Sequence, residues 1–462
     1  MKKLNFDTLL MIFAVIVMTA AVTWLIPGGE YQRQVKEGKT LVVPDSFSYT
    51  ESNPQGIADI LSSPFKGFVK ASEIIAFLFL LGGSFSVILR TGAITVAIQH
   101  MAKTFAQKPH LQKYFIPGTM LIFSLAGTTF GMAEEVMLFI PLFIPLAISL
   151  GYDSITGTAI PFLGAAAGFA GSTFNPFTVG IAQSIAEVPL YSGLEYRIVI
   201  WCISTAGMIF FVARYAKRVK ADPSVSPVYA ADQERRHTMH LDTSAVEPFT
   251  LRYTVILLLF FFSLAALVYG VLAFGWWLSE IAALFLALGI LSGVAGRLKP
   301  SDITASFRDG AKDMVGVAMI IACARAILVI ATEGRVLDVL LHACSGLISS
   351  VHPVFAAQMM FVVQGIINFF VHSGSGQAAL TMPIMAPLAD VLGLTRQTAV
   401  LAFQFGEGWI NPILPTSGLT MGVLGLARIQ WNVWFRWMLP IQIFFFIVAL
   451  LLLIPPVLLH WQ

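Results

Sequence analysis

The chain has 462 residues, of which 57% are hydrophobic and 11% charged, and its mean hydropathy is +0.80. Soluble globular proteins carry about 25% charged residues, so this composition excludes a soluble domain and places the chain in a bilayer. The formal charge of +3 is too small to indicate a nucleic-acid binder. Cys202, Cys323 and Cys344 are widely spaced in apolar segments, so neither a disulfide framework nor a zinc site is indicated.

The first apolar run, at 9–26, is predicted to be an uncleaved membrane span. It follows Met1, Lys2 and Lys3, as the apolar part of a secretory signal would. However, its length approaches the ~20 residues that a spanning helix needs, and it ends without a small-residue cleavage pattern.

Eight further apolar stretches have spanning length, and two more are too long for a single span. The eight are 73–90, 154–187, 195–215, 251–273, 276–295, 313–331, 396–426 and 433–456. The long stretches, 114–150 and 353–392, are interrupted near their middles by GTTFGMAEE and HSGSGQ. Because irregular backbone at membrane depth must be shielded from lipid, each is predicted to be a re-entrant hairpin with a polar tip. The sequence thus predicts an all-α polytopic membrane protein with about nine transmembrane helices plus two re-entrant hairpins.

Basic residues support this arrangement of crossings. With the N-terminus on the cytoplasmic side, 19 of the 28 Lys and Arg fall inside, eight fall outside, and Arg325 lies within a span. This excess follows the positive-inside rule. The long polar insertion at 216–250 is predicted to be a cytoplasmic linker between a first half at 1–215 and a second half at 251–462. The first half contains the hairpin 114–150 and the broken helix 154–187, and the second contains the hairpin 353–392 and the broken helix 396–426.

The two halves form an internal repeat. Residues 141–151 read PLFIPLAISLG and residues 383–393 read PIMAPLADVLG, with six of eleven positions identical at an offset of 242. The same offset pairs Phe65 with Phe307 and Gly164 with Gly406. An odd number of crossings separates the two core units, which predicts an inverted-topology repeat. In secondary transporters this architecture places the binding site near the midplane.

Four polar breaks, two in each half, are the predicted binding site. They are the two hairpin tips and the breaks GSTFNP (171–176) and GEGWINPILPTS (406–417) in the spans that follow. Proline and glycine there interrupt the helix and free backbone groups that bind ions and anionic groups. The alternative is that the prolines only kink the helices. The candidate binding residues are Thr128, Thr129, Gly131, Glu134, Glu135, Ser172, Thr173, Asn175, Ser373, Gly374, Ser375, Gly376, Gln377, Glu407, Asn411, Thr416 and Ser417.

Charged residues at membrane depth point to the chemistry of this site. Glu134, Glu135 and Glu407 would each cost roughly 2–3 kcal/mol in hydrocarbon, so they are expected to face an aqueous cavity or a partner. They suit a cationic substrate, a coupling cation or a transported proton. Arg325 is the available charge partner, either for a glutamate or for a substrate carboxylate. His372 is a weaker candidate for moving a proton.

The sequence contains no nucleotide-binding P-loop, HExxH or GxSxG motif. Transport would therefore be driven by an ion or solute gradient. Two rivals remain open: an intramembrane enzyme that uses Glu134, Glu407 and His372 as acid and base groups, and a passive channel. The inverted repeat favours transport over an enzyme, because catalysis has no need of two-sided symmetry.

The segments GTTFGMAEE…GSTFNPF and HSGSGQ…FGEGWINP, with TWLIPGGEY at 23–31, resemble the anaerobic dicarboxylate carrier and arginine–ornithine antiporter-like family, specifically its YfcC-type members. The resemblance covers nearly the whole chain. It implies the ion-transporter-superfamily fold, a homodimer in the bacterial inner membrane, and a transport part that moves as an elevator between the two sides.

The resemblance and the tip residues together indicate the substrate. Acidic tips suit basic amino acids, so arginine or ornithine is the expected solute, moved by exchange or ion coupling. A sodium- or proton-coupled dicarboxylate symporter is the alternative. No cofactor and no resident metal are expected, and the coupling ion would be sodium or a proton.

Overall fold

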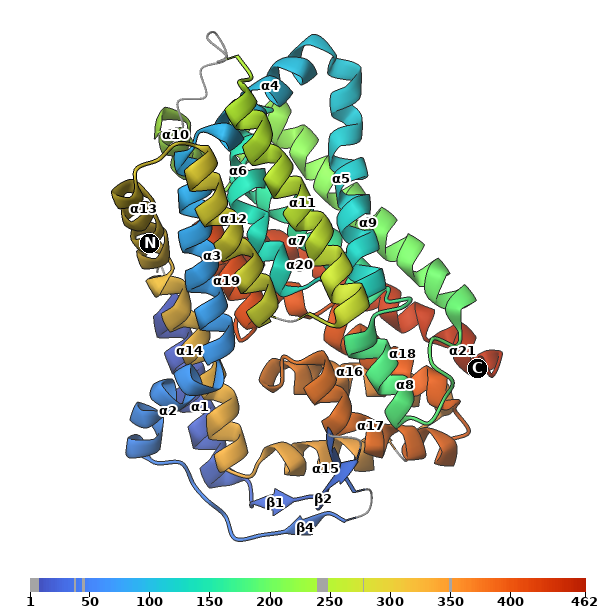
Figure 1. Ribbon diagram of the computed structural model, residues 1–462. Coiled ribbons are helices and arrows are strands. Elements are labelled where there is room, and N and C mark those ends of the chain that lie inside the picture. Colours follow the sequence, from blue (N-terminus) through green and yellow to red (C-terminus); the bar gives the residue numbers. More distant parts are fainter. Residues whose placement is uncertain (1–7, 37–38, 44–45, 239–247, 277, 349–350) are drawn as a thin grey trace.

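The computed structural model of this chain describes residues 8–36, 39–43, 46–238, 248–276, 278–348 and 351–462. The described chain is predominantly helical, and its few short strands gather at one end (Figure 1). The predicted helical class is therefore confirmed.

The N-terminal quarter contains the first predicted span and the strands. Helix α1 (Thr8–Leu25) is followed by β1 (Gly29–Glu30), β2 (Arg33–Lys36), β3 (Lys39–Val42) and β4 (Ser48–Tyr49), and then by α2 (Ile57–Lys70), α3 (Ser72–Arg90) and α4 (Ala93–Gln107). Strand β1 pairs antiparallel with β4, and β2 pairs antiparallel with β3. Arg33 forms an ion pair of 2.9 Å with Asp338, which ties this strand region to α15 (Leu337–Ile348).

The predicted first hairpin and first broken helix are interrupted where the polar residues lie. The elements are α5 (Pro109–Phe130), η1 (Glu134–Leu138), α6 (Ile140–Ser149), α7 (Ser154–Ala170), η2 (Pro176–Gly180), α8 (Ile181–Ile185) and α9 (Leu194–Ala221). Gly131 ends α5 with a φ of +74°, a left-handed conformation that glycine adopts without strain. Asn175 caps η2 by accepting a hydrogen bond from the Phe177 N–H.

The second half repeats this pattern. It comprises α11 (Leu251–Phe274), α12 (Leu278–Ala295), α13 (Pro300–Asp313), α14 (Val315–Glu333), α15, α16 (Pro353–Phe370), α17 (Gly374–Val391), α18 (Arg396–Gly408), η4 (Asn411–Ile413), α19 (Gly418–Ala427), α20 (Trp431–Leu452) and α21 (Ile454–Leu458). Ser373 and Ser417 cap α17 and α19 through side-chain hydrogen bonds to backbone N–H groups.

The predicted linker at 216–250 contains regular structure. Its first residues complete α9, and η3 (Pro223–Val225) and α10 (Tyr229–Thr238) follow. Asp232 on α10 accepts a hydrogen bond of 2.7 Å from the Ser154 N–H, and Arg235 donates to the Ala427 carbonyl at 2.6 Å. Burial raises the pKa of the Asp232 carboxyl above its ordinary value, although the Ser154 hydrogen bond and the Arg235 charge oppose this shift. The linker therefore contacts both halves. The boundaries predicted for the halves stay a prediction, and residues 239–247 lie outside the described chain.

Seven helical stretches in the described chain are long and apolar enough to span a membrane, judged by length and composition. They include α3, α9, α12 and α16. Helix α16 alone has 18 residues, although the sequence assigns it to the second hairpin. A multi-pass membrane protein is thus confirmed, whereas the count of nine crossings plus two re-entrant hairpins stays a prediction.

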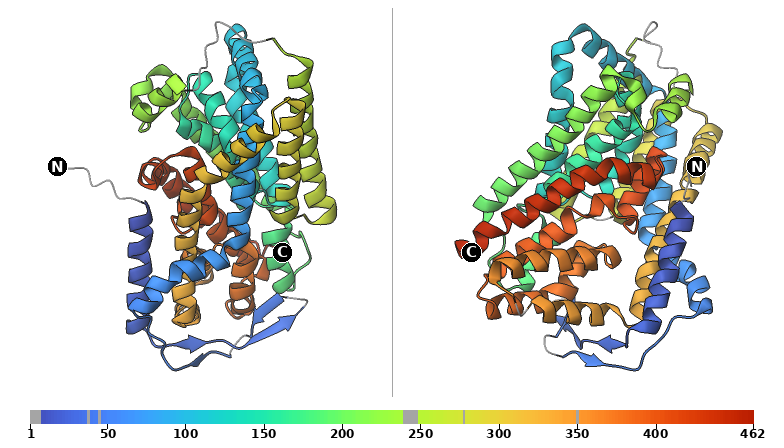
Figure 2. Two further views of the ribbon diagram at one scale, coloured as in Figure 1. Left: turned by 60° about the vertical axis from the view of Figure 1, so that its left-hand side comes forward. Right: turned by 180° about the vertical axis from the view of Figure 1, so that it is seen from behind.

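Two groups of helices account for most of the packing. Helix α14 packs against α1 and α2, and α3 packs against α12 and α13. The other group contains α5 to α9 and α16 to α20, with α9 and α20 running side by side (Figure 2). The groups meet where α14 contacts α19, where α4 contacts α5 and α6, and where α15 contacts α16 and α17.

The first group contains two matching pairs of consecutive helices, α2 with α3 and α13 with α14. Helices α2 and α13 each have 14 residues, and the helices that follow them, α3 and α14, each have 19. Helix α2 lies against α14, and α13 lies against α3, so each short helix packs on the long helix of the other pair. This exchange supports the predicted repeat, whose inverted orientation stays a prediction.

We expect the substitution Gly67→Ala to destabilise the protein by about 1–3 kcal/mol. A Cβ atom at Gly67 would lie 2.2 Å from the Ala322 carbonyl oxygen and 2.8 Å from the Ala326 nitrogen, so α2 and α14 would have to separate. Thermal unfolding in detergent measures the effect. Gly316→Ala, on α14 itself, is the matched control, because nothing lies within 4 Å of its added Cβ. Equal melting of the two variants would contradict the close crossing.

Candidate functional site

A cavity of about 480 Å³ lies between the two groups of helices, where both predicted hairpin tips meet the second helix break. Its lining comes from the α2–α3 junction, the first tip, η2, α14, the second tip and the α18–α19 break. Eleven of the candidates from sequence line it. They are Gly131, Glu134, Glu135, Arg325, Ser373, Gly374, Ser375, Glu407, Asn411, Thr416 and Ser417.

The first tip presents two carboxylates with different surroundings. Glu134 and Glu135 open η1 directly after the turn at Gly131. The Glu135 side chain folds back, and its Oε2 accepts a hydrogen bond of 2.9 Å from the Ala133 N–H. Glu134 is half-buried and lines the cavity, and its carboxylate bonds its own backbone N–H rather than another residue of the tip. Of the two, Glu134 is therefore the one available to a ligand.

The second break carries the most deeply buried carboxylate of the cavity. Glu407, on the last turn of α18, is 2% exposed. Its Oε1 accepts a hydrogen bond of 3.0 Å from Asn411 Nδ2, whereas its Oε2 is buried without a hydrogen-bond partner among the described residues. A buried, unpartnered carboxylate oxygen in the wall of a cavity is costly unless a cation or a donor reaches it.

Asn368 on α16 holds this break in place. Its Nδ2 donates to the carbonyl oxygens of Gly406 and Glu407 and to Asn411 Oδ1, at 3.1–3.3 Å. The carbonyls freed where α18 ends are thus partly satisfied by the neighbouring helix. This contact fixes Glu407 relative to the second hairpin.

The second tip adds hydroxyl groups and a histidine. His372 Nε2 and Thr416 Oγ1 share a hydrogen bond of 2.6 Å, which joins the tip to the break before α19. A Cβ atom at Gly374 would lie 2.4 Å from Thr178 Cγ2 and 3.6 Å from Glu407 Oε1. The second tip therefore touches both broken helices, one from each half.

The remaining candidates lie outside the cavity lining. The Thr173 N–H donates to Thr128 Oγ1 at 3.0 Å, and Asn175 packs against Gly131. Gln377 donates to Gln364 at 2.8 Å, and Thr129 donates to the carbonyl of Leu125. Outside the cavity lining are Thr128, Thr129, Ser172, Thr173, Asn175, Gly376 and Gln377. Thr128, Thr173 and Asn175 therefore join the first tip to the first helix break.

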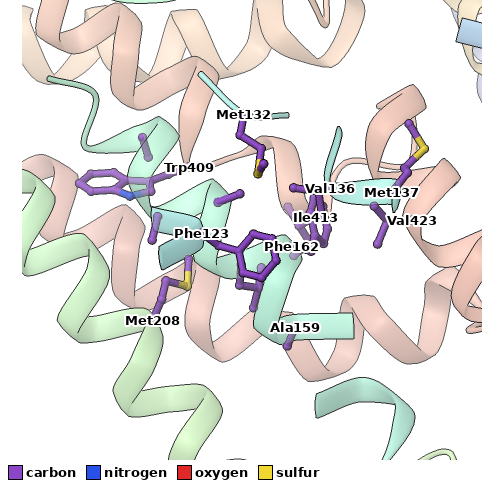
Figure 3. Close-up of a cluster of buried hydrophobic side chains, with 14 of the residues drawn as sticks. Phe123, Met132, Val136, Met137, Ala159, Phe162, Met208, Trp409, Ile413 and Val423 are labelled. Carbon is purple, nitrogen blue, oxygen red and sulfur yellow. The ribbon is translucent and has the colours of Figure 1, made fainter. Parts of the chain in front are cut away.

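A cluster of apolar side chains forms the rigid backing of the site (Figure 3). It joins Met132 and Val136 of the first tip to Phe162 of α7 and to Trp409 and Ile413 of the second break. Because close-packed side chains transmit displacement, the first tip and the second break are held as one unit.

The structure adds lining residues that the sequence analysis does not single out as binding candidates. Lys70 and Glu73 flank the break between α2 and α3, and Thr178 comes from η2. One sequence signal could have indicated these residues. The 14-residue segment 57–70, just before the second span, is amphipathic and has lysines near its end. His372, the weaker candidate, also lines the cavity.

The charges of the cavity are segregated by the group of helices that carries them. Lys70 and Arg325 come from α2 and α14, whereas Glu134, Glu135 and Glu407 come from the opposite group. With Glu73 included, formal negative charges exceed positive ones by two. Arg325 and Glu134 attract each other electrostatically, yet Arg325 takes part in none of the close ion pairs found in the described chain.

Apolar helices of spanning length around a charged cavity, with interrupted helices supplying its lining, define the class of membrane transporters. The chain belongs to the DcuC family, the C4-dicarboxylate anaerobic carriers, whose family model matches residues 6–457. The resemblance drawn from the tip and break motifs is thereby confirmed. Family and relatives point to a transporter rather than an enzyme.

Two relatives match along nearly their whole length. The chain is 36% identical over 473 residues to a protein of Escherichia coli K12 named "Putative basic amino acid antiporter YfcC", covering 93% of this chain and 92% of the relative. It is 31% identical over 507 residues to an uncharacterized protein of Haemophilus influenzae, covering 100% of this chain and 97% of the relative.

Two solved transporter structures are more distant. The YdaH transporter of Alcanivorax borkumensis has a TM-score of 0.45 and 14% identity, over 99% of each chain. MtrF of Neisseria gonorrhoeae, described within a class of antimetabolite efflux pumps, has a TM-score of 0.43 and 17% identity, over 98% of this chain and 95% of its own.

Proposed function

We propose that the protein is a secondary active transporter of the bacterial inner membrane that exchanges basic amino acids such as arginine and ornithine. The observation that carries this proposal is the excess of carboxylates in the central cavity, above all the unpartnered Oε2 of Glu407. A guanidinium or ammonium group provides the charge and the donors that this oxygen lacks.

Glu407 and Glu134 are the proposed ligands of the substrate's cationic groups. Asn411, Thr416 and Ser417 supply further oxygens next to Glu407, and Ser373 and Ser375 do so from the second tip. The name of the Escherichia coli relative, a basic amino acid antiporter, supports the same substrate class.

Movement of one group of helices against the other is the proposed transport step. The group with both hairpins and both broken helices contains Glu134 and Glu407, the carboxylates that would bind the substrate. The group with α2 and α14 acts as the scaffold of an elevator. Support comes from the limited set of helices through which the groups meet. We further propose that the scaffold forms the interface of a homodimer, and that both hairpins are re-entrant.

A carboxylate or dicarboxylate symporter coupled to sodium or protons is the second candidate. Two observations favour it. The cavity lining also contains Lys70 and Arg325, and the family is described as C4-dicarboxylate anaerobic carriers. Cationic side chains bind carboxylates by charge-assisted hydrogen bonds.

Counterflow in proteoliposomes separates the two candidates. Vesicles loaded with unlabelled arginine are expected to accumulate external labelled arginine transiently, and external ornithine should compete while succinate should not. Empty protein-free vesicles are the control. Uptake of labelled succinate driven by a sodium or proton gradient, together with no arginine counterflow, would contradict the proposed exchange of basic amino acids.

A further inference from the structure

Arg325 is held rigidly on the scaffold side of the cavity. It lies on α14 between Ala322 and Ala326, the residues whose backbone Gly67 of α2 approaches most closely. The crossing leaves no room for a Cβ on α2, so α14 cannot shift there without moving α2. The guanidinium is therefore presented to the cavity from a fixed helix.

The opposite wall offers Glu134 and Glu407, neither of which forms a close ion pair within the described chain. Arg325 lines the same cavity as both, and Glu407 Oε2 has no hydrogen-bond partner among the described residues. Both carboxylates belong to the group of helices that carries the hairpin tips. A guanidinium is the side chain best suited to bridge carboxylates, because its five donors are arranged in a planar fork.

We propose that Arg325 is a tethered substitute for the substrate cation: it neutralises Glu134 when no substrate is bound, and so makes transport an obligatory exchange. This inference rests on the proposed function. In the structure Arg325 and Glu134 line the same cavity without a close ion pair. In the unloaded carrier the guanidinium moves up to Glu134 and joins the two groups of helices by a charge contact. A basic amino acid competes with the guanidinium for the same carboxylate and breaks this contact.

The physical reason is the cost of uncompensated charge at membrane depth. Moving unpaired carboxylates past an apolar barrier is unfavourable, so a carrier without a cation stays where the scaffold arginine can pair with them. A loaded carrier brings its own compensating cation and is released. The consequence is that efflux requires a substrate on the other side.

The rival role for Arg325, anchoring the substrate carboxylate, has the opposite sign in a binding experiment. Removing a competitor for Glu134 strengthens the binding of arginine, whereas removing an anchor weakens it. The two roles therefore predict changes in arginine affinity of opposite sign.

The test uses Arg325→Gln and Arg325→Lys, with Arg308→Gln, an exposed arginine on α13, as the matched control. We expect Arg325→Gln to lower about tenfold the arginine concentration that gives half-maximal thermal stabilisation in detergent. We also expect it to release labelled arginine from proteoliposomes into substrate-free buffer about tenfold faster than the unsubstituted protein. Arg325→Lys should restore the need for external substrate, and Arg308→Gln should behave as the unsubstituted protein.

Weaker arginine binding by Arg325→Gln, with efflux still dependent on external substrate, overturns the inference and assigns Arg325 to the substrate carboxylate. Absence of arginine counterflow in the unsubstituted protein instead overturns the proposed function. A folding defect is recognised separately from the melting temperature without arginine and from size-exclusion chromatography. Should Arg325→Gln misfold, Arg325→Met, which keeps most of the side chain's length without its charge, replaces it in both measurements with the same expected results.

Discussion

Glu407→Gln is expected to raise the KM for arginine exchange about 10–100-fold, which corresponds to loss of one charge-assisted hydrogen bond of about 1.5–3 kcal/mol. The amide keeps the size of the side chain, and its Oε1 still accepts the hydrogen bond that Asn411 donates. What it loses is the negative charge beside the buried, unpartnered Oε2. Initial rates of labelled arginine counterflow measure the effect.

Glu51→Gln is the matched control, because this exposed glutamate lies before α2, outside the cavity lining. It makes the same change in composition and charge, and we expect unchanged kinetics. If Glu407→Gln also transports arginine with an unchanged KM, Glu407 does not bind the substrate cation.

Asp153→Ala is expected to lower the free energy of unfolding by about 3–5 kcal/mol, because it leaves several donors without an acceptor. Asp153 is 3% exposed and caps α7 by accepting from the N–H and hydroxyl of Thr156 at 2.8 and 2.7 Å. Its other oxygen accepts from the hydroxyls of Tyr215 at 2.5 Å and Ser226 at 2.6 Å. One carboxylate thus joins α7, α9 and the segment after η3.

Asp222→Ala is the matched control, since Asp222 also caps a short helix but is exposed, and its side chain accepts from the N–H and hydroxyl of Ser224. Its loss should lower the stability much less than the loss of Asp153. Thermal unfolding of both variants in the same detergent gives the comparison. A fall in melting temperature for Asp153→Ala no larger than for Asp222→Ala would show that the buried network does not stabilise the packing of α7 against α9.

The positions of the helix breaks were predictable because their causes are local. Gly131, Pro176 and Pro412 each stand beside further small or polar residues, and this combination weakens a helix locally. The structure interrupts the chain at these points. Proline alone is no sufficient signal, because Pro161 and Pro383 lie inside helices. Long apolar runs were equally informative, since their length alone identifies candidate spans.

Short amphipathic helices were not predictable in the same way. The segment 57–70 contains Pro64 and several polar residues, and 300–313 contains five charged residues, so neither resembles a span or a long helix. Their helical state depends on packing, α2 against α14 and α13 against α3. Tertiary contacts of this kind outweigh local propensity and leave little trace in one sequence.

The same reasoning explains the outcome at the site. Carboxylates at membrane depth, such as Glu134 and Glu407, signal a cavity because nothing else there stabilises them, and both line it. Small hydroxyl residues such as Thr128 and Ser172 carry no such signal, since they serve equally well to hold a turn. Lys70 and Glu73 reach the cavity only because α2 meets α3 there, which depends on the three-dimensional arrangement.

A structure of the protein with bound ornithine tests the central claim most directly, namely that carboxylates from both halves bind one basic amino acid in the cavity. We predict that a cationic group of ornithine lies within hydrogen-bond distance of Glu407 Oε2, with Glu134 on the opposite side of the ligand. Ornithine bound outside this cavity, or a dicarboxylate bound between Lys70 and Arg325 in a protein that ignores ornithine, would contradict the account.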